Sequence, residues 1–403
     1  MRSLKNTLPF ILPAMLLLNA LTSPTSAETI SLSTQQSQYR TELYQPTVFE
    51  WAENVSNLNH FLLNAYEKKI NPTNENSLTH TLFMLPAYLV HLKLSYSIAT
   101  VVHESGHAAT DYLHGFAPYF GAGFDDEWID LPLSVWDLYL NEITTSGRAY
   151  TGVDNPNNVT LTPIMNAQIL GAGINYNTDF AKNILFQSLT SIKSKHNLID
   201  FQVNRSLGAL YVATNLNGSD PDGDPNRYIS ALNEQGYDIT IDQLFYAHVA
   251  AFLLSPSSTD LSRFDADTSI YPHTLFDISF LLPEWFVYLN PSSVSMLTAT
   301  LFPITQTKFF ILEVESVLYG KRTPLELTFS VISKNTSGFS YKGSLNIDTD
   351  FNYFAKTEIK KKMNNILSLI ANIKYGNNQT LKQTREWPYN DPILNIGVQI
   401  HYH

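Results

Sequence analysis

Two histidines and a glutamate in the segment Val101–Ala108, which reads V-V-H-E-S-G-H-A, are spaced for metal-dependent hydrolysis. His103 and His107 are four residues apart, so a helix would place both imidazoles on one face, about one turn apart. Two imidazoles at that separation can bind one zinc ion, and the neighbouring Glu104 can reach a water bound to it. Zinc lowers the pKa of such a water towards ~7, and the carboxylate can then take its proton. The pattern therefore predicts a hydrolase with Zn2+ as cofactor and Glu104 as general base.

An apolar segment that would form a helix contains this motif. Residues Leu82–Val102 are mostly apolar with only Pro86 as a breaker, and Ala108–Leu113 contains neither glycine nor proline. The segment Thr81–Val102 is nearly long enough to span a membrane, but His91 and Lys93 would be costly there. We therefore expect a buried core helix. The alternative to a zinc site is a satisfied histidine pair on that helix.

The motif resembles the zinc-binding helix of the zincin metallopeptidases, of either the gluzincin or the site-2-protease type. The resemblance is limited to residues 101–115, where small residues at Gly106 and Ala108 accompany the motif and Gly115 follows it. It implies zinc on His103 and His107 with Glu104 as general base. It does not imply a particular substrate.

The resemblance leaves the third zinc ligand open. Thermolysin-like enzymes supply a glutamate from a following helix in an Asn-Glu context, and Glu142 in L-Y-L-N-E-I has this form, so it is the preferred ligand. The rivals are Glu127, Asp179 and Asp222, the last because site-2-type enzymes use an aspartate that precedes glycine. Asp111 could orient an imidazole, or it could be a solvated helix charge.

Two other groups of polar residues are better explained by structure than by chemistry. Asp220, Asp222 and Asp224 alternate, but Ala231 stands where an EF-hand loop would need a glutamate. We therefore expect Asp224 to cap a helix that starts at Pro225. His248 lies in an apolar segment and is predicted to be a core or rim histidine.

The first 27 residues have the pattern of a secretory signal peptide. A positively charged start precedes the apolar stretch Leu8–Leu21, and small residues lie before Glu28. The sequence contains no cysteine, which favours the periplasm or outer membrane of a Gram-negative bacterium over a disulfide-rich secreted domain. The net charge of −11, with no basic patch, argues against nucleic acid as a partner.

The hydrophobic pattern changes period along the chain, which predicts an α+β protein. Residues 28–280 read mainly as helices, including Phe49–Lys69, Leu131–Thr145 and Thr162–Lys193. Roughly eight strand-like segments with period-two alternation follow between Trp285 and Tyr402. We thus expect a helical zincin-like domain at 28–280. It would be followed by an antiparallel β-meander or β-barrel domain at 281–403, which could be soluble or lie in the outer membrane.

These observations together predict an exported zinc-dependent metallohydrolase, with a peptidase as the leading expectation. Its substrate would be a peptide or another envelope component such as peptidoglycan or lipid, since ligand chemistry does not encode the substrate. The alternative is an envelope β-barrel or binding protein in which the histidine pair is structural or vestigial.

Overall fold

The computed structural model describes the chain in sixteen stretches. They are residues 40–43, 48–70, 78–124, 127–131, 134–145, 148–190, 195–216, 220–259, 273–275, 278–305, 308–321, 326–334, 339–348, 353–362, 367–376 and 393–400. The signal peptide expected at residues 1–27 lies outside the described residues.

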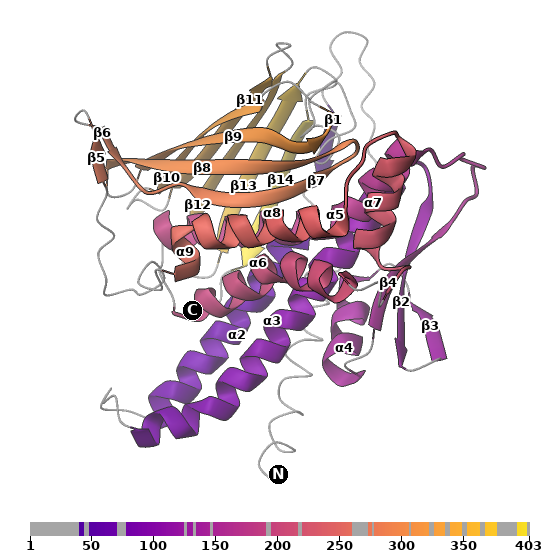
Figure 1. The fold of residues 1–403 in the computed structure, drawn as a ribbon. Helices are drawn as coiled ribbons and strands as arrows, with labels where there is room; N and C mark the ends of the chain where they lie inside the picture. Colours follow the sequence, from indigo (N-terminus) through magenta and orange to yellow (C-terminus); the bar gives the residue numbers. More distant parts are fainter. Residues whose placement is uncertain are drawn as a thin grey trace.

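Eight helices make up most of the described N-terminal two thirds of the chain (Figure 1). They are α2 (Val48–Ile70), α3 (Leu78–Leu113), α4 (Val135–Thr145), α5 (Pro163–Thr190), α6 (Lys195–Asn215), α7 (Asp224–Glu234), α8 (Ile241–Leu254) and α9 (Pro256–Thr259). The helices predicted from apolar spacing are confirmed. Pro86 lies inside α3 without ending it, so the motif-bearing helix has 36 residues and is ~54 Å long.

A small sheet interrupts the helices and was not predicted. It consists of β2 (Ala117–Phe124), β3 (Glu127–Leu131) and β4 (Arg148–Asp154), in the order β3-β2-β4. Gly121 and Gly123, which resemble loop residues in the sequence, belong to strand β2. Gly121 lies beneath the ring of Tyr150 on the paired strand, where a side chain would not fit. A short hairpin, β5 (His273–Leu275) with β6 (Ile278–Phe280), precedes the large sheet.

The C-terminal third forms a nine-stranded sheet, and the predicted eight strands are confirmed. These eight are β7 (Glu284–Asn290), β8 (Ser293–Thr305), β9 (Lys308–Gly320), β10 (Glu326–Lys334), β11 (Phe339–Asp348), β12 (Tyr353–Lys362), β13 (Leu367–Gly376) and β14 (Ile393–Ile400). They form an antiparallel meander in chain order, and β1 (Arg40–Leu43) pairs in parallel with β14. In the described part of the chain this sheet is open, with β1 and β7 at its edges.

Helices and sheet share their core, because the helices pack against the first strands of the sheet (Figure 1). One buried cluster joins Trp51 of α2 and Val101 of α3 to Phe286 of β7 and Leu297 of β8. A second cluster joins α5–α8 to Leu289 of β7. The mixed α+β class is therefore shown, whereas separate domains at 28–280 and 281–403 stay a prediction.

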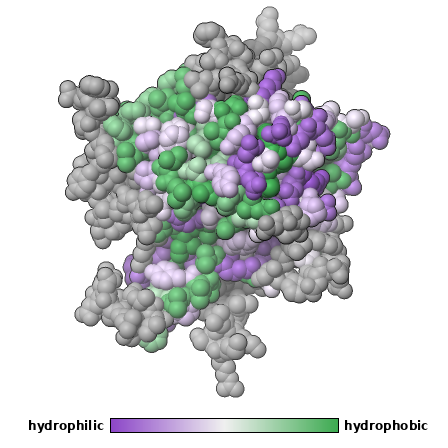
Figure 2. Space-filling view, viewed as in Figure 1, coloured by the Kyte–Doolittle hydropathy of each residue, from purple (hydrophilic) through white to green (hydrophobic). Residues whose placement is uncertain are grey.

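The outer half of the α2–α3 hairpin exposes many apolar side chains, which Figure 2 shows as hydrophobic surface low on the molecule. The exposed ones are Phe61, Leu62, Tyr66, Phe83, Leu85, Leu89, Val90, Leu92 and Tyr96. Residues Phe83–Leu113 of α3 are long and apolar enough to cross a membrane by length and composition, a test that core helices also pass. The expectation of a buried core helix holds for residues 97–108 but is wrong for the exposed outer half.

Candidate metal centre

The two motif histidines lie buried on one face of α3 with their Nε2 atoms turned towards each other. The His103 and His107 side chains are 8% and 7% exposed. Their Nε2 atoms are 3.1 Å apart, and the ring planes cross at 73°. The predicted helix therefore brings the two imidazoles together as the spacing requires.

Helix α5 runs antiparallel to α3 and fixes the orientation of both rings. The Nδ1–H of His107 donates to the carbonyl oxygen of Ile169 at 2.7 Å. The amide nitrogen of Asn177 donates to the carbonyl of Ala99 at 2.8 Å, so its Oδ1 is the acceptor for the Nδ1–H of His103 at 3.0 Å. Both Nδ1 atoms therefore carry a proton. In the neutral rings the lone pairs are on the two Nε2 atoms, which face the same point, as in metal-binding histidines.

Gly173 leaves the space between these lone pairs empty of protein. A Cβ at this position would lie 2.5 Å from Nε2 of His103 and 2.6 Å from Nε2 of His107. Ile169, Gly173 and Asn177 are spaced by four, so one face of α5 supplies both hydrogen-bond acceptors and the gap between them. The small residues at 171–173 therefore permit a close approach to the histidines as well as to a neighbouring helix.

The third group at this point is Asp224, the first residue of α7. Its Oδ2 lies 3.1 Å from Nε2 of His107 and 3.5 Å from Nε2 of His103. The ligand atoms of the three residues all lie within 4.8 Å of one another. The prediction that Asp224 caps the helix is wrong: Gly223 is the N-cap and makes no side-chain cap, and the Asp224 carboxylate turns to the histidines instead.

The Asp224 carboxylate favours a positive charge at this centre. Burial opposes a charge on His107, but the nearby Asp224 carboxylate outweighs it and raises the pKa of His107 to about 9. Burial would raise the pKa of Asp224, but the two histidines hold it well below its usual range. Two Nε2 lone pairs and a carboxylate converge here, and such a set of nitrogen and oxygen donors suits a zinc ion. The residues present therefore fit the metal that the motif implies.

Glu104 lies next to this centre and is held by the small sheet. The Thr151 hydroxyl of β4 lies 2.9 Å from Oε2 of Glu104 and equally close to its backbone carbonyl, so it can donate to either. The Glu104 side chain is largely buried, and its charge helps to raise the pKa of His107. Sequence reasoning missed Thr151, because an isolated threonine in a short strand carries no signal of its own.

Tyr211 of α6 is a second neighbour that sequence reasoning missed. Its ring meets the His103 ring edge-on with centroids 5.6 Å apart. Its hydroxyl donates to Oδ2 of Asp224 at 3.3 Å and accepts from the backbone N–H of the same residue at 3.3 Å. Burial, reinforced by the Asp224 carboxylate, raises the pKa of Tyr211. A protonated phenol therefore lies at the edge of the centre, where it can donate a hydrogen bond.

Glu142, the preferred third ligand, does not join the histidines in this geometry. It is buried on α4, where burial raises its pKa to about 7, Lys93 opposes the shift and Glu104 adds to it. Among the described residues that could hold a metal ion, Asp224 groups with the two histidines and Glu142 does not. The cause is the fold: α4 lies on the Glu104 side of α3, whereas α7 places its first residue over the imidazoles.

The other candidate ligands lie elsewhere. Asp179 accepts a hydrogen bond from Tyr288 at 2.6 Å and lies 3.4 Å from Lys182, and Asp222 is exposed in the turn before α7. Glu127 begins β3, the edge strand of the small sheet. Asp111 is buried rather than solvated, and burial raises its pKa to about 6. It does not orient the His107 ring, because Nδ1–H of His107 donates to the carbonyl of Ile169.

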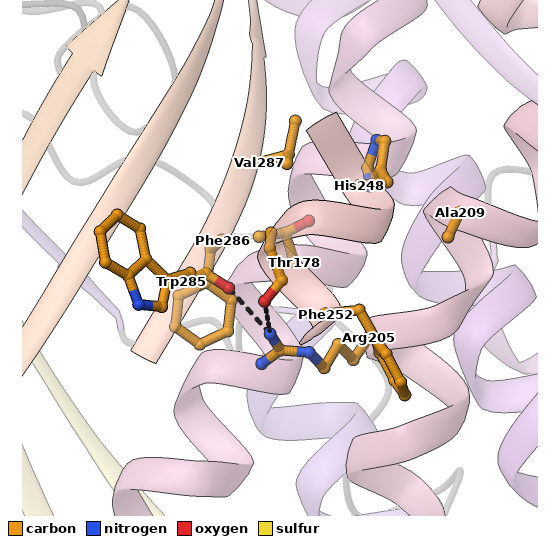
Figure 3. Close-up of a pocket in the computed structure, with 9 residues that line it drawn as sticks. Thr178, Arg205, Ala209, His248, Phe252, Trp285, Phe286 and Val287 are labelled. Atoms are coloured by element: carbon orange, nitrogen blue, oxygen red, sulfur yellow. Dashed lines mark hydrogen bonds between the residues drawn. The ribbon is translucent and has the colours of Figure 1, made fainter. Parts of the chain in front are cut away.

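His248 is a buried histidine remote from any metal-type cluster among the described residues, so its prediction as a core or rim residue is confirmed. It lines a small pocket between α5, α6, α8 and β7 (Figure 3). There Arg205 donates to the carbonyl of Trp285 at 2.8 Å. Burial, with Arg205 nearby, lowers the pKa of His248 to about 4. The pocket therefore holds a structural arginine rather than a second catalytic group.

Comparisons with protein-family models, curated proteins and solved structures found no match for this chain. The geometry and chemistry of the site therefore carry the function proposed below.

Proposed function

We propose that this protein is a zinc-dependent hydrolase that cleaves peptides, with zinc held by His103, His107 and Asp224. The observation that carries the proposal is the convergence of three donor atoms, two from histidines whose rings α5 holds and one from Asp224, which Tyr211 of α6 contacts. Asp224 replaces Glu142 as the proposed third ligand. Asp224 lies two residues after Asp222, the rival that precedes glycine, and it is the first residue of α7.

The proposed roles of the chain's own residues follow from their positions. Zinc in such a site supplies Lewis acidity, which activates water and polarises a scissile carbonyl. Glu104 takes the proton of the attacking water and returns it to the leaving group. Its carboxylate lies beside the two histidines and is not one of the three proposed ligands, so it is free for this role. Thr151 orients the Glu104 carboxylate, and Tyr211 donates to Asp224 and so orients the third proposed ligand.

The resemblance to zincin metallopeptidases, together with an exported location in the cell envelope, remains part of this proposal. The buried helix with its two histidines and adjacent glutamate supports the resemblance. The exposed apolar side chains on the α2–α3 hairpin support a location at an apolar surface such as the envelope membrane. Peptidoglycan and lipid are alternative substrates, and an envelope binding protein with an inert histidine pair is the alternative function.

The test is the variant Glu104→Gln, which removes the base and keeps the shape of the side chain. We expect purified variant and wild type to contain equal zinc, while kcat/KM on a mixed peptide library, read by mass spectrometry, falls by at least ~100-fold. Glu67→Gln, a change in α2 away from the motif, serves as the control and should keep full activity. Equal hydrolysis by wild type and Glu104→Gln would contradict the mechanism, and absence of bound zinc would favour the binding protein.

A further inference from the structure

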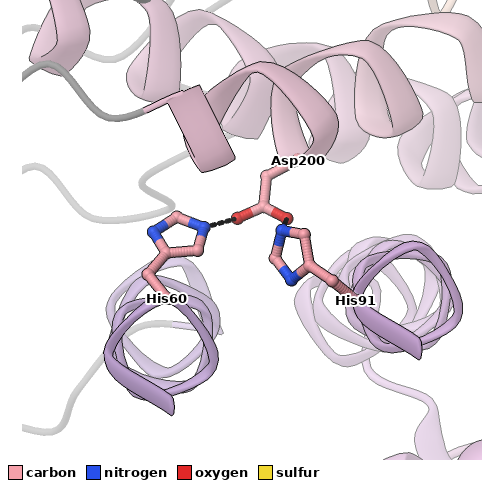
Figure 4. Close-up of side chains that lie close together, drawn as sticks. All are labelled: His60, His91 and Asp200. Carbon is pink, nitrogen blue, oxygen red and sulfur yellow. Dashed lines mark ion pairs between the residues drawn. The ribbon is translucent and has the colours of Figure 1, made fainter. Parts of the chain in front are cut away.

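A second cluster of histidine and carboxylate side chains lies deep in the helical bundle, away from the site described above. His60 of α2, His91 of α3 and Asp200 of α6 point towards one another, each from a different helix (Figure 4). All three residues are buried, and their ligand atoms lie within 4.8 Å of one another. From this geometry we propose that His60, His91 and Asp200 bind a second divalent transition-metal ion of the zinc class.

The donor atoms are placed around a common point. Nε2 of His60 lies 2.9 Å from Oδ2 of Asp200, and Nε2 of His91 lies 3.5 Å from Oδ1 of the same carboxylate. The ring centroids of the two histidines are 5.2 Å apart. Two imidazoles and one carboxylate again form a donor set that suits zinc.

His91 is the observation that points to a ligand rather than to a closed hydrogen-bond network. Its side chain is 3% exposed, and its Nε2 has no hydrogen bond with the described residues, only the 3.5 Å contact with Asp200. The backbone of His196 is another polar neighbour of the ring. Buried polar atoms are almost always paired, because an unpaired one loses its hydrogen bonds to water without replacement. A metal ion on Nε2 would supply the missing partner.

Asp200 is oriented as a ligating carboxylate would be. Two serine hydroxyls donate to it, Ser56 to Oδ2 and Ser95 to Oδ1. Each oxygen has further lone pairs and can still face the histidines. Such hydrogen bonds to a carboxylate from outside the ligand set are what fixes its direction at metal sites.

The second site is separate from the first and has a structural role. His91 precedes His103 by twelve residues on the same helix, a distance of ~18 Å, whereas paired catalytic metals lie ~3.5–4 Å apart. The second ion joins α2, α3 and α6. Asn204 of α6 links the two sites, since it donates to the Asp200 carbonyl and accepts from Asn177, the partner of His103.

Metal analysis by inductively coupled plasma mass spectrometry tests this site independently of the proposed function. We expect two zinc ions per wild-type chain, one in His103→Ala/His107→Ala, and one in His91→Gln. Adding His91→Gln to the double variant should leave none. His196→Gln is the matched control, because its ring lies 5.9 Å from His91 but its Nε2 contacts Asn64.

A spectroscopic measurement keeps the proposal testable if a variant folds poorly. Cobalt-loaded His103→Ala/His107→Ala protein should show d–d absorption bands of histidine and carboxylate ligation, and these should persist in the added His196→Gln variant. If the wild type binds one ion and His103→Ala/His107→Ala binds none, the second site is overturned and the proposed function stands. If the wild type binds one ion and only His91→Gln loses it, the second site is upheld and the first is overturned.

Discussion

At the scale of single residues, Gly173 and Asn177 explain how ordinary helix packing produces a metal-binding geometry. Asn177 fixes the His103 ring and Gly173 leaves room for an ion, while both residues belong to one face of α5. Neither a glycine nor an asparagine in a helix indicates such a role in the sequence. Their roles follow from the antiparallel packing of α5 on α3, which places each beside a particular imidazole.

The variant Gly173→Ala should lose zinc while all three proposed ligands remain. The added Cβ would lie 2.5 Å from Nε2 of His103, in the space that an ion would share. Gly171→Ala is the control, since its Cβ would meet Leu289 of β7 and not the histidines. We expect zinc per folded chain to fall only in Gly173→Ala, measured after dialysis against a weak chelator. Equal zinc in both variants would contradict the placement of the ion.

Glu142 should make the stability of the protein depend on pH. Its pKa is about 7 in the folded protein against 4.5 ordinarily, so its ionisation costs folding energy. Between pH 4.5 and pH 7 the folded protein keeps the Glu142 proton that the unfolded chain loses. The free energy of unfolding therefore falls as pH rises through this range. Glu142→Gln should be more stable than wild type at pH 8, by on the order of 2 kcal/mol, and similar at pH 4.5. Urea unfolding at both pH values measures this, and an equal difference at both would rule it out.

At the scale of elements, helix and strand types were predictable, but the contacts between them were not. Period-two alternation gave β10–β14, and helical spacing gave α2–α5. The small sheet β2–β4 was missed because its glycines, which make room for tyrosine rings, look like turn residues. Asp224 was missed as a ligand because an aspartate at the start of a helix is usually a cap. The packing of α7 instead directs its carboxylate to the two histidines.

A buried ion pair ties α5 to the large sheet. Nζ of Lys182 lies 2.9 Å from Oε1 of Glu313 in β9, and both side chains are largely buried. Burial opposes the charge on Lys182, but the Glu313 carboxylate outweighs it and raises the lysine's pKa. Lys182→Met would remove the positive charge that faces the buried glutamate and should cost ~3–5 kcal/mol of stability. Lys182→Met/Glu313→Leu should restore most of the lost stability, measured by urea unfolding. A double variant no more stable than Lys182→Met would contradict this role of the ion pair.

At the scale of the whole molecule, the helices and the sheet are expected to unfold together. Phe286 and Leu297 of the first strands share a buried cluster with Trp51 and Val101 of the helices. The period of the hydrophobic pattern changes near residue 281, but the core does not divide there. The sequence pattern could not reveal this, since alternation shows which face of a strand is buried and not what covers it.

Leu297→Ala tests this coupling from the strand side. Leu297 is 2% exposed, so its truncation should cost ~2–5 kcal/mol. Hydrogen exchange followed by mass spectrometry at low denaturant should show faster exchange in peptides of both β8 and α3, because they open as one unit. Leu282→Ala, at a 40% exposed position, is the control. Faster exchange confined to the strands would indicate separately folding domains.

The central claim is that Asp224, and not Glu142, completes the metal centre on His103 and His107. Zinc content of Asp224→Asn and Glu142→Gln, measured side by side with wild type after equal dialysis against a chelator, tests it most directly. The geometry predicts that Asp224→Asn loses one zinc ion per chain and Glu142→Gln loses none. Loss of zinc from Glu142→Gln with retention in Asp224→Asn would contradict the account.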